Sequence, residues 1–516
     1  MVFGSLIKNE PAGAVHLGSP EAEAESLPTS NVKLWDVYED FHRLAAQLHT
    51  QKFILIGRKG CGKSAFAEYV CSVANNSATE HAKFIKAGEV HIQQALQLGA
   101  AAGSGVSEES FFEWLVFTNL LKLFLNNEAI QFDREFEKLR QFLSKNSGYI
   151  DIRELEIKEL VEKNGFEIST DYLTRFLKGK LNKNVEIKSG RAPYYKLLPH
   201  LEEVIIKCMK SPVEKNNRNE YVLFFDDLDI LFSANGQHTS DSIVSLVRAC
   251  KRINNEVFAK NSISAKIIVL LRDDIETFLS SAYPDTAKLF SSYATRISWY
   301  QDDYAVNRKN EDTLYLKKMI CNRIAHAQDV GELAKNGASV WEALVQPQVG
   351  KRNTTFQYVV NQTLFRPRDL ILFFKPLENG GWVTPLSNNS LRALAAVYHE
   401  ELVKEIYNEL SSFYTKNTID LIFDALAEIC KTTEPVDYGV AKKALDNFIK
   451  NIDTTLIIEH LFDRSIVGNS DQKYHYHFKC RHMLGSGKPL ELDISKKIIV
   501  QYGIAAYVRN KYHGWK

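Results

Sequence analysis

The chain has 516 residues, of which 45% are hydrophobic and 25% are charged, and its formal net charge is +1 at pH 7. This composition is typical of a folded globular protein with room for about three domains, and it excludes a chain built wholly around nucleic acid. No stretch reaches the ~18 apolar residues of a membrane helix. The N-terminus lacks the apolar core of a signal peptide, and the seven cysteines include no C-x-x-C pair. Both observations predict a cytoplasmic location.

The first segment, residues 1–30, is rich in small and acidic residues and contains proline. This composition predicts a flexible N-terminal arm. Apolar residues then recur at helical spacing from Leu34 to Leu48. This spacing predicts one amphipathic helix that leads into the first strand.

The run Phe53-Ile54-Leu55-Ile56 predicts a buried parallel strand, because it is apolar, short and rich in β-forming residues. A glycine-rich loop follows and fits the pattern G-x-x-x-x-G-K-[ST]. Its backbone N–H groups are expected to cradle the phosphates of ATP, and a helix start points its positive dipole end at them. The expected binding residues are Gly57, Gly60, Cys61, Gly62, Lys63, Ser64 and Ala65. Lys63 is expected to reach the β- and γ-phosphates, and the Ser64 hydroxyl to hold Mg²⁺.

The stretch between this loop and the next strand is far longer than one β-α step requires, so it predicts a helical insertion at about 100–215. Ser107 is expected to cap a strong helix in it, with Glu108 and Glu109 in the first turn. A basic run from Arg175 to Lys196 leaves two interpretations open. It is either a solvated surface or a contact for a phosphate backbone.

The run Tyr221 to Phe225 predicts a second buried strand, and two acids follow at its carboxyl end, where ligands bind in open α/β sheets. Asp226 is the expected ligand on the metal side. Asp227 is the candidate for polarising the attacking water, and Asp229 is a weaker third acid.

Three arginines downstream are candidates for contacting the nucleotide, either as sensors of its γ-phosphate or as a finger from a neighbouring subunit. Arg272 follows the strand Lys266 to Leu271, and it is expected either to sense the γ-phosphate, to pair with Asp227, or to form a plain salt bridge to the acidic turn. Arg296 precedes a last short strand and is either a finger to a neighbouring subunit or a plain surface residue. Arg368 follows Pro367 at a helix start, and it is favoured over Arg366 for folding onto the nucleotide.

Two further domains are predicted after the core, which spans residues 31–304. Residues 305–415 have a helical pattern and form the expected lid. Residues 416–516 predict three helices and a hairpin around Gly468-Asn469, which together suggest a winged helix.

Four motifs follow one another in the chain: the glycine-rich loop, Asp226-Asp227-Leu228-Asp229, Arg272-Asp273-Asp274 and Arg366-Pro367-Arg368-Asp369. This ordered set resembles the STAND group of ATPases, which are relatives of the AAA+ and origin-recognition ATPases. More narrowly, it is similar to a bacterial GRKGxGKS/DDLD P-loop ATPase family. The resemblance implies an α/β P-loop core, ATP and Mg²⁺, the sensor roles of Arg272 and Arg368, and the finger role of Arg296. Phe365 stands where relatives more usually have glycine, and Asp227 replaces the glutamate of most AAA+ proteins, which implies slow hydrolysis.

Two classes of function follow from these residues. The first is an ATP-driven switch that acts through homo-oligomerisation or a protein partner, and the resemblance associates it with defence against phage. The second is a DNA-binding ATPase similar to origin-recognition proteins, which uses the winged helix and the basic run. Salt-dependent binding to duplex DNA distinguishes the two.

Overall fold

A computed structural model describes residues 13–86, 107–128, 130, 133–150, 167–181, 190–210, 218–228, 237–301, 311–327, 337–349, 353–472, 475–482 and 490–514. The chain divides into two compact units. The sheet unit comprises residues 42–57 and 66–295, and the helical unit comprises residues 1–41, 58–65 and 296–516. The phosphate loop therefore belongs by its contacts to the helical unit, although the strand before it belongs to the sheet unit.

The sheet unit is built on a five-stranded sheet with the order β2-β5-β6-β1-β7. Neighbours β2 and β5, β5 and β6, and β6 and β1 are all parallel. The strands are β1 (Ile54–Gly57), β2 (Glu80–Lys86), β5 (Glu220–Asp226), β6 (Ala265–Arg272) and β7 (Ala294–Arg296). The apolar runs of β1, β5 and β6 are buried, as expected for parallel strands covered on both faces, whereas β2 and β7 are mostly half-buried. The predicted parallel α/β class with a phosphate-loop core is confirmed.

The register of the sheet brings its chemistry-bearing residues to one edge. Gly57 pairs directly with Arg272 across β1 and β6. Asp226 ends β5, the neighbour of β6 on the other side. Because all three strands are parallel, their carboxyl ends meet at this edge, the usual place for a ligand in an open sheet.

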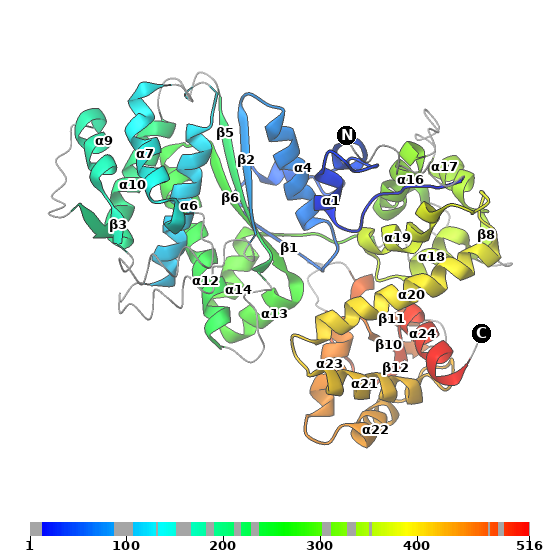
Figure 1. Cartoon of the computed structure of the whole chain (residues 1–516). Coiled ribbons are helices and arrows are strands. Elements are labelled where there is room, and N and C mark those ends of the chain that lie inside the picture. Colours follow the sequence, from blue (N-terminus) through cyan, green and yellow to red (C-terminus); the bar gives the residue numbers. More distant parts are fainter. Residues whose placement is uncertain are drawn as a thin grey trace, which may run out of the picture. The chain divides into compact units, whose positions relative to one another are not determined.

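Helices surround this sheet and form the predicted insertion (Figure 1). The helices beside the sheet are α3 (Leu44–Gln47), α4 (Lys63–Asn75), α12 (Gln237–Arg252), η5 (Ile253–Phe258), η6 (Ala259–Asn261), α13 (Asp273–Ala282) and α14 (Pro284–Tyr293). The insertion contains α6 (Glu108–Leu125), η2 (Arg134–Phe136), α7 (Glu137–Lys145), η3 (Ser147–Tyr149), β3 (Glu167–Ser169), α9 (Asp171–Leu181), β4 (Arg191–Pro193) and α10 (Tyr194–Met209). The Ser107 side chain accepts a hydrogen bond from the Ser110 amide at the start of α6, which is the cap that the sequence predicts.

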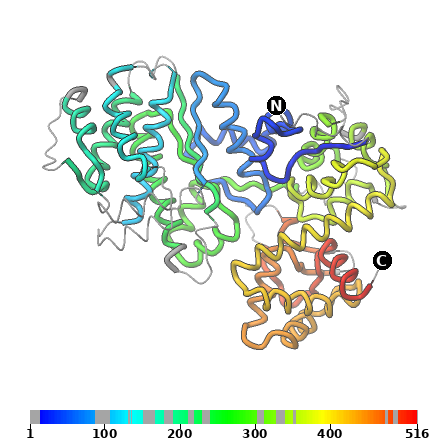
Figure 2. Tube along the Cα trace, viewed as in Figure 1, coloured from blue at the N-terminus to red at the C-terminus, as the bar shows by residue number. Residues whose placement is uncertain are grey.

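The helical unit begins with α1 (Ala22–Ser26) and α2 (Leu34–Val37) and continues through the segment predicted as a lid. That segment contains η7 (Glu311–Thr313), α16 (Tyr315–Ala327), α17 (Gly337–Leu344), β8 (Gln348–Val349), β9 (Asn353–Thr354), α18 (Thr355–Gln362), α19 (Pro367–Phe374), η9 (Lys375–Asn379) and α20 (Asn388–Leu410). One continuous hydrophobic core joins these helices to the C-terminal segment. In Figure 2 the tube passes from yellow to red as α20 leads into that segment.

The C-terminal segment contains α21 (Lys416–Ile429), α22 (Tyr438–Phe448), α23 (Thr454–Asp463), β10 (Val467–Gln472), β11 (His475–His477), η10 (Lys479–Arg481), β12 (Lys497–Val500) and α24 (Tyr502–His513). The three predicted helices are present. The predicted turn is wrong, because Gly468 and Asn469 lie inside β10, and β11 and β12 flank that strand in an antiparallel sheet. Gly468 is required there for packing, since a Cβ would lie 2.7 Å from the His477 carbonyl oxygen.

The N-terminal segment differs from the predicted flexible arm in the part that the structure describes. Glu25 is 1% exposed, and its carboxylate binds Arg323 of α16 through two contacts of 2.6 and 3.0 Å. Arg323 also donates to the Leu17 carbonyl oxygen at 2.9 Å. A Cβ at Gly18 would lie 2.1 Å from Glu25 Oε1, so only glycine fits beside this pair. The ion pair and the buried Val15 and Leu17 side chains anchor the segment to the helical core.

The single helix predicted from Leu34 to Leu48 is also wrong. The segment forms α2 and α3 with a break between them, and Arg43 before α3 has a left-handed backbone, with φ of 53°. The boundary between the two units falls in this break, after Phe41. Within the described residues, no helix combines the length and the apolar character that a membrane span requires.

Candidate functional site

The phosphate loop runs from the end of β1 to the start of α4, as the motif predicts. Gly60 and Gly62 have φ of 76° and 94°, backbone conformations that favour glycine. Lys63 is the first residue of α4 and is 7% exposed, and its Nζ donates to the Arg58 carbonyl oxygen at 3.1 Å. Ser64 and Ala65 follow in the first turn of this 13-residue helix. The loop therefore has the helix start and the glycine conformations that a phosphate cradle requires.

The carbonyl oxygens of this loop are held by residues of the helical unit. Arg366 NH1 donates to the Lys59 oxygen at 3.1 Å, and the Trp299 indole donates to the Cys61 oxygen at 2.7 Å. The Arg368 amide lies 3.5 Å from the Gly60 oxygen, at the limit of a hydrogen bond. Three consecutive carbonyls thus contact the helical unit.

Gly60 lies so close to α19 that a side chain has no room. A Cβ at this position would lie 3.0 Å from both Cβ and Cδ of Arg368. At Gly62 a Cβ would meet no atom within 4 Å, although its φ is also positive. A comparison of substitutions at the two glycines therefore separates the effect of backbone strain from that of steric contact.

We expect Gly60→Ala to reduce the free energy of unfolding by about 2–3 kcal/mol, since both a positive φ and a steric clash oppose the methyl group. Gly62→Ala carries the strain alone and should cost only about 1 kcal/mol. Urea unfolding of the two variants measures the difference. Equal losses would contradict the close approach of Arg368 to Gly60.

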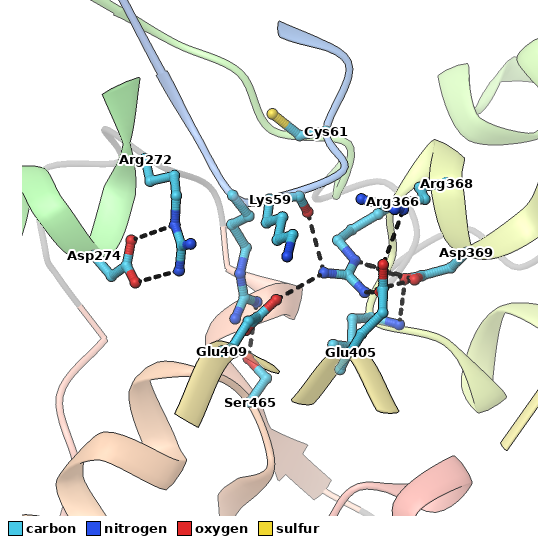
Figure 3. A network of polar contacts seen from close by, with 12 residues as sticks. Lys59, Cys61, Arg272, Asp274, Arg366, Arg368, Asp369, Glu405, Glu409 and Ser465 are labelled. Carbon is cyan, nitrogen blue, oxygen red and sulfur yellow. Dashed lines mark hydrogen bonds and ion pairs between the residues drawn. The ribbon is translucent and has the colours of Figure 1, made fainter. Parts of the chain in front are cut away.

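Arg366 is buried at the start of α19, in a cage of three carboxylates (Figure 3). Its Nε and NH2 bind Asp369, the shortest contact being 2.7 Å, and NH2 also binds Glu405 at 2.9 Å. Glu409 lies 3.5 Å from NH1. Burial alone lowers the pKa of Arg366, but the three carboxylates outweigh it and raise that pKa well above its ordinary value. The guanidinium therefore stays charged.

Arg368, the arginine favoured for the nucleotide, is less buried than Arg366. Its Nε lies 2.9 Å from Glu405 Oε1, and its NH2 lies 3.8 Å from Glu21 Oε1. Glu405 thus contacts both arginines with its two oxygens (Figure 3). The expectation that Arg368 contacts the nucleotide stays a prediction.

The acidic edge of the sheet unit has one unusual backbone conformation. Asp226 ends β5 and is 8% exposed. Asp227 follows with φ of 57°, a left-handed conformation that aspartate tolerates better than most residues. Asp229 lies outside the described residues.

Arg272 is held by an acid two residues away in the chain. Its Nε and NH2 bind the two oxygens of Asp274 at 3.0 and 2.7 Å, a bidentate pair at the start of α13. Figure 3 shows the two hydrogen bonds of this pair. Arg272 is thus fixed at the carboxyl edge of the sheet, opposite Gly57. Sequence analysis expected Asp227 or the acidic turn after β5 as the pairing partner, whereas the pair that the structure shows is with Asp274 of α13.

The remaining predicted residues are placed as follows. Arg296 does not precede the last strand, as predicted, but is the last residue of β7, and it is half-buried. Of the basic run, residues 182–189 lie outside the described residues, while Arg175 is exposed on α9. Across the ranges that the structure describes, no three His, Cys, Asp or Glu side chains gather as a metal-binding group.

Sequence analysis missed two partners of the phosphate loop. Arg58 donates to the Ser465 hydroxyl at 2.9 Å and, at 3.2 Å, to the carbonyl oxygen of Asp463, the last residue of α23. Trp299 was assigned no role by sequence analysis. Neither role has a signal in the sequence, because both contacts join segments more than 200 residues apart.

Comparison with known proteins gives limited likenesses. The family described as the FunZ-associated C-terminal helical domain matches residues 315–379, which include Arg366 and Arg368. A solved structure of the Aeropyrum pernix ORC2 protein, in ADPNP-ADP complexes, is 10% identical, with 98% of this chain and 96% of that chain covered and a TM-score of 0.38. The Cdc6p structure from Pyrobaculum aerophilum is 11% identical, with 95% and 98% covered and a TM-score of 0.28. No curated protein matches the chain.

Proposed function

We propose that this chain is an ATP-binding molecular switch with slow hydrolysis, whose nucleotide state controls its assembly and its signal to a protein partner. The observation that supports this proposal most is the contact of the phosphate loop with α19. The backbone that would cradle phosphate and the helix start that carries Arg366 and Arg368 touch directly. A change in the loop is therefore transmitted to the helical unit.

The residues divide into roles for binding and for chemistry. The Lys63 ammonium and the loop amides bind the phosphates, and the Ser64 hydroxyl and the Asp226 carboxylate are the oxygen ligands for Mg²⁺. Bound Mg²⁺ neutralises charge on the phosphate oxygens. Asp227 orients the attacking water, and its short side chain makes this orientation weak, so turnover is slow.

Arg368 is the proposed switch residue. It pairs with Glu405 but remains partly exposed, and it lies at the end of α19 nearest the loop. A γ-phosphate competes with Glu405 for this arginine, and ADP does not. Arg272 senses the same phosphate from the sheet, and Arg296 acts as a finger to the nucleotide of a neighbouring copy. By the resemblance, the proposed setting is defence against phage or mobile DNA.

Light scattering tests the switch. The mass of the wild-type protein is expected to rise with ATP and Mg²⁺, and that of Lys63→Ala to stay constant, with or without duplex DNA. Arg296→Ala is expected to bind ATP and remain at the lower mass. If mass rises only when DNA is added, the DNA-binding alternative replaces this proposal.

A further inference from the structure

We infer that Arg366 is a positioning residue that sets the direction of a phosphate-binding amide in the loop without contacting the nucleotide. This inference rests on the proposed function, since it concerns how the same site binds phosphate. It assigns different roles to two arginines that stand two positions apart: Arg366 shapes the loop, and Arg368 contacts the ligand.

The three nitrogens of the Arg366 guanidinium bind different partners. Nε and NH2 are committed to Asp369 and Glu405, through contacts between 2.7 and 3.1 Å. Only NH1 reaches the loop, where it donates to the Lys59 carbonyl oxygen at 3.1 Å. Because the guanidinium is planar, fixing two of its nitrogens fixes the direction of the third.

The carboxylates around Arg366 are themselves held in place. Asp369 is fully buried, and its Oδ2 also accepts a hydrogen bond from the Leu364 amide at 2.9 Å. Glu405 and Glu409 lie one turn apart on the same face of α20. Arg366 is therefore fixed by two helices of the helical core, independently of any ligand.

The direction of the Lys59 carbonyl also sets the direction of the next amide. The peptide unit between Lys59 and Gly60 is planar and trans, so its C=O and N–H point in opposite directions. Holding the Lys59 oxygen toward Arg366 consequently aims the Gly60 N–H away from α19. Trp299 acts likewise on the Gly62 N–H, since it binds the Cys61 oxygen.

A residue that orients a loop amide and a residue that contacts the γ-phosphate have different effects on the affinities for ATP and ADP. A loop amide serves the phosphate groups that ATP and ADP share. Losing its orientation should therefore weaken both nucleotides by the same factor. A residue that touches the γ-phosphate affects ATP alone, which is the expectation for Arg368.

The experiment compares Arg366→Lys with wild type by calorimetric titration of ATP and ADP in the presence of Mg²⁺. Lysine keeps the charge that the carboxylates require but cannot bind Asp369 and Lys59 in the same geometry. Both affinities are expected to fall by about tenfold or more, the cost of one charged hydrogen bond, and by equal factors within about twofold. Arg368→Gln should lower the affinity for ATP alone.

Two further variants make the result decisive. Arg509→Lys is the matched control, because Arg509 also donates to two backbone oxygens of the helical unit, those of Cys430 and Thr432. It should lower the unfolding temperature and leave both affinities unchanged. If Arg366→Lys does not fold, Glu409→Gln removes the carboxylate nearest NH1 and should weaken both nucleotides equally, by about threefold.

Amide hydrogen exchange in the nucleotide-free protein completes the test. Exchange of the Cys61 amide, which donates to the Arg58 carbonyl oxygen at 3.2 Å, should be at least about tenfold faster in Arg366→Lys than in wild type, because this turn of the loop is no longer held at the Lys59 oxygen. A loss for ATP that exceeds the loss for ADP overturns the inference in favour of a direct contact. Unchanged affinities and exchange overturn it in favour of a role in folding alone. If wild type binds neither nucleotide, the proposed function fails, and the exchange rates still decide whether Arg366 orders the loop.

Discussion

Lys63→Ala is expected to weaken ATP binding by about 100-fold or more. The Lys63 ammonium is the one side-chain charge that the loop motif aims at the β- and γ-phosphates, and two charged hydrogen bonds of about 1.5–3 kcal/mol each account for a loss of this size. In the structure the ammonium donates to the Arg58 carbonyl oxygen of the same loop. The free energy of unfolding without nucleotide should therefore change by only about 1 kcal/mol.

Calorimetric titration with ATP and Mg²⁺ measures the effect, and urea unfolding checks that the variant is folded. Lys52→Ala provides the control, because Lys52 precedes β1 and lies outside the loop. Its affinity for ATP should equal that of wild type. An unchanged affinity in Lys63→Ala would show that the loop does not bind the triphosphate.

Glu25→Ala is expected to reduce the free energy of unfolding by about 3–5 kcal/mol, which is the usual cost of leaving a buried charge without its partner. Glu25 and Arg323 are both buried, and the Ser19 amide donates to the same carboxylate at 2.7 Å. The variant therefore leaves Arg323 with only the Leu17 oxygen among its hydrogen-bond partners described above. Urea unfolding followed by far-ultraviolet circular dichroism measures the loss.

The matched control is Glu23→Ala, at the exposed glutamate of the same helix, which should change stability by less than about 1 kcal/mol. The double variant Glu25→Leu with Arg323→Met replaces the pair by apolar side chains and should regain most of the lost stability. If Glu25→Ala were as stable as wild type, the N-terminal segment would not be anchored by this pair.

Much of the sheet unit could be predicted from its sequence, because continuous apolar runs bounded by glycine or acids specify buried parallel strands. The strands ending at Gly57, Asp226 and Arg272 were all predicted in this way. The start of α19 at Pro367 was predicted from proline chemistry. These signals are local, so they can be read from a few neighbouring residues.

The contacts that decide the roles of the arginines are not local. Arg366 and Arg368 lie on either side of Pro367, and on α20 Glu405 contacts both of them, whereas Glu409 lies near Arg366. Spacing of four residues does predict that these two glutamates share a face of α20. How that face meets the two arginines depends on the packing of α19 against α20. The buried pair of Glu25 and Arg323 was missed for the same reason.

The left-handed backbone at Asp227 limits which residues can occupy the position directly after β5. Besides glycine, asparagine and aspartate occupy this region of backbone space at least cost, whereas glutamate is disfavoured in it. The longer acid of most AAA+ proteins therefore cannot be introduced here without a backbone cost of about 1 kcal/mol. Asparagine, in contrast, preserves both the shape of the side chain and the conformation of the chain while removing the charge. This position thus offers a way to separate electrostatics from geometry that few sites in a protein provide.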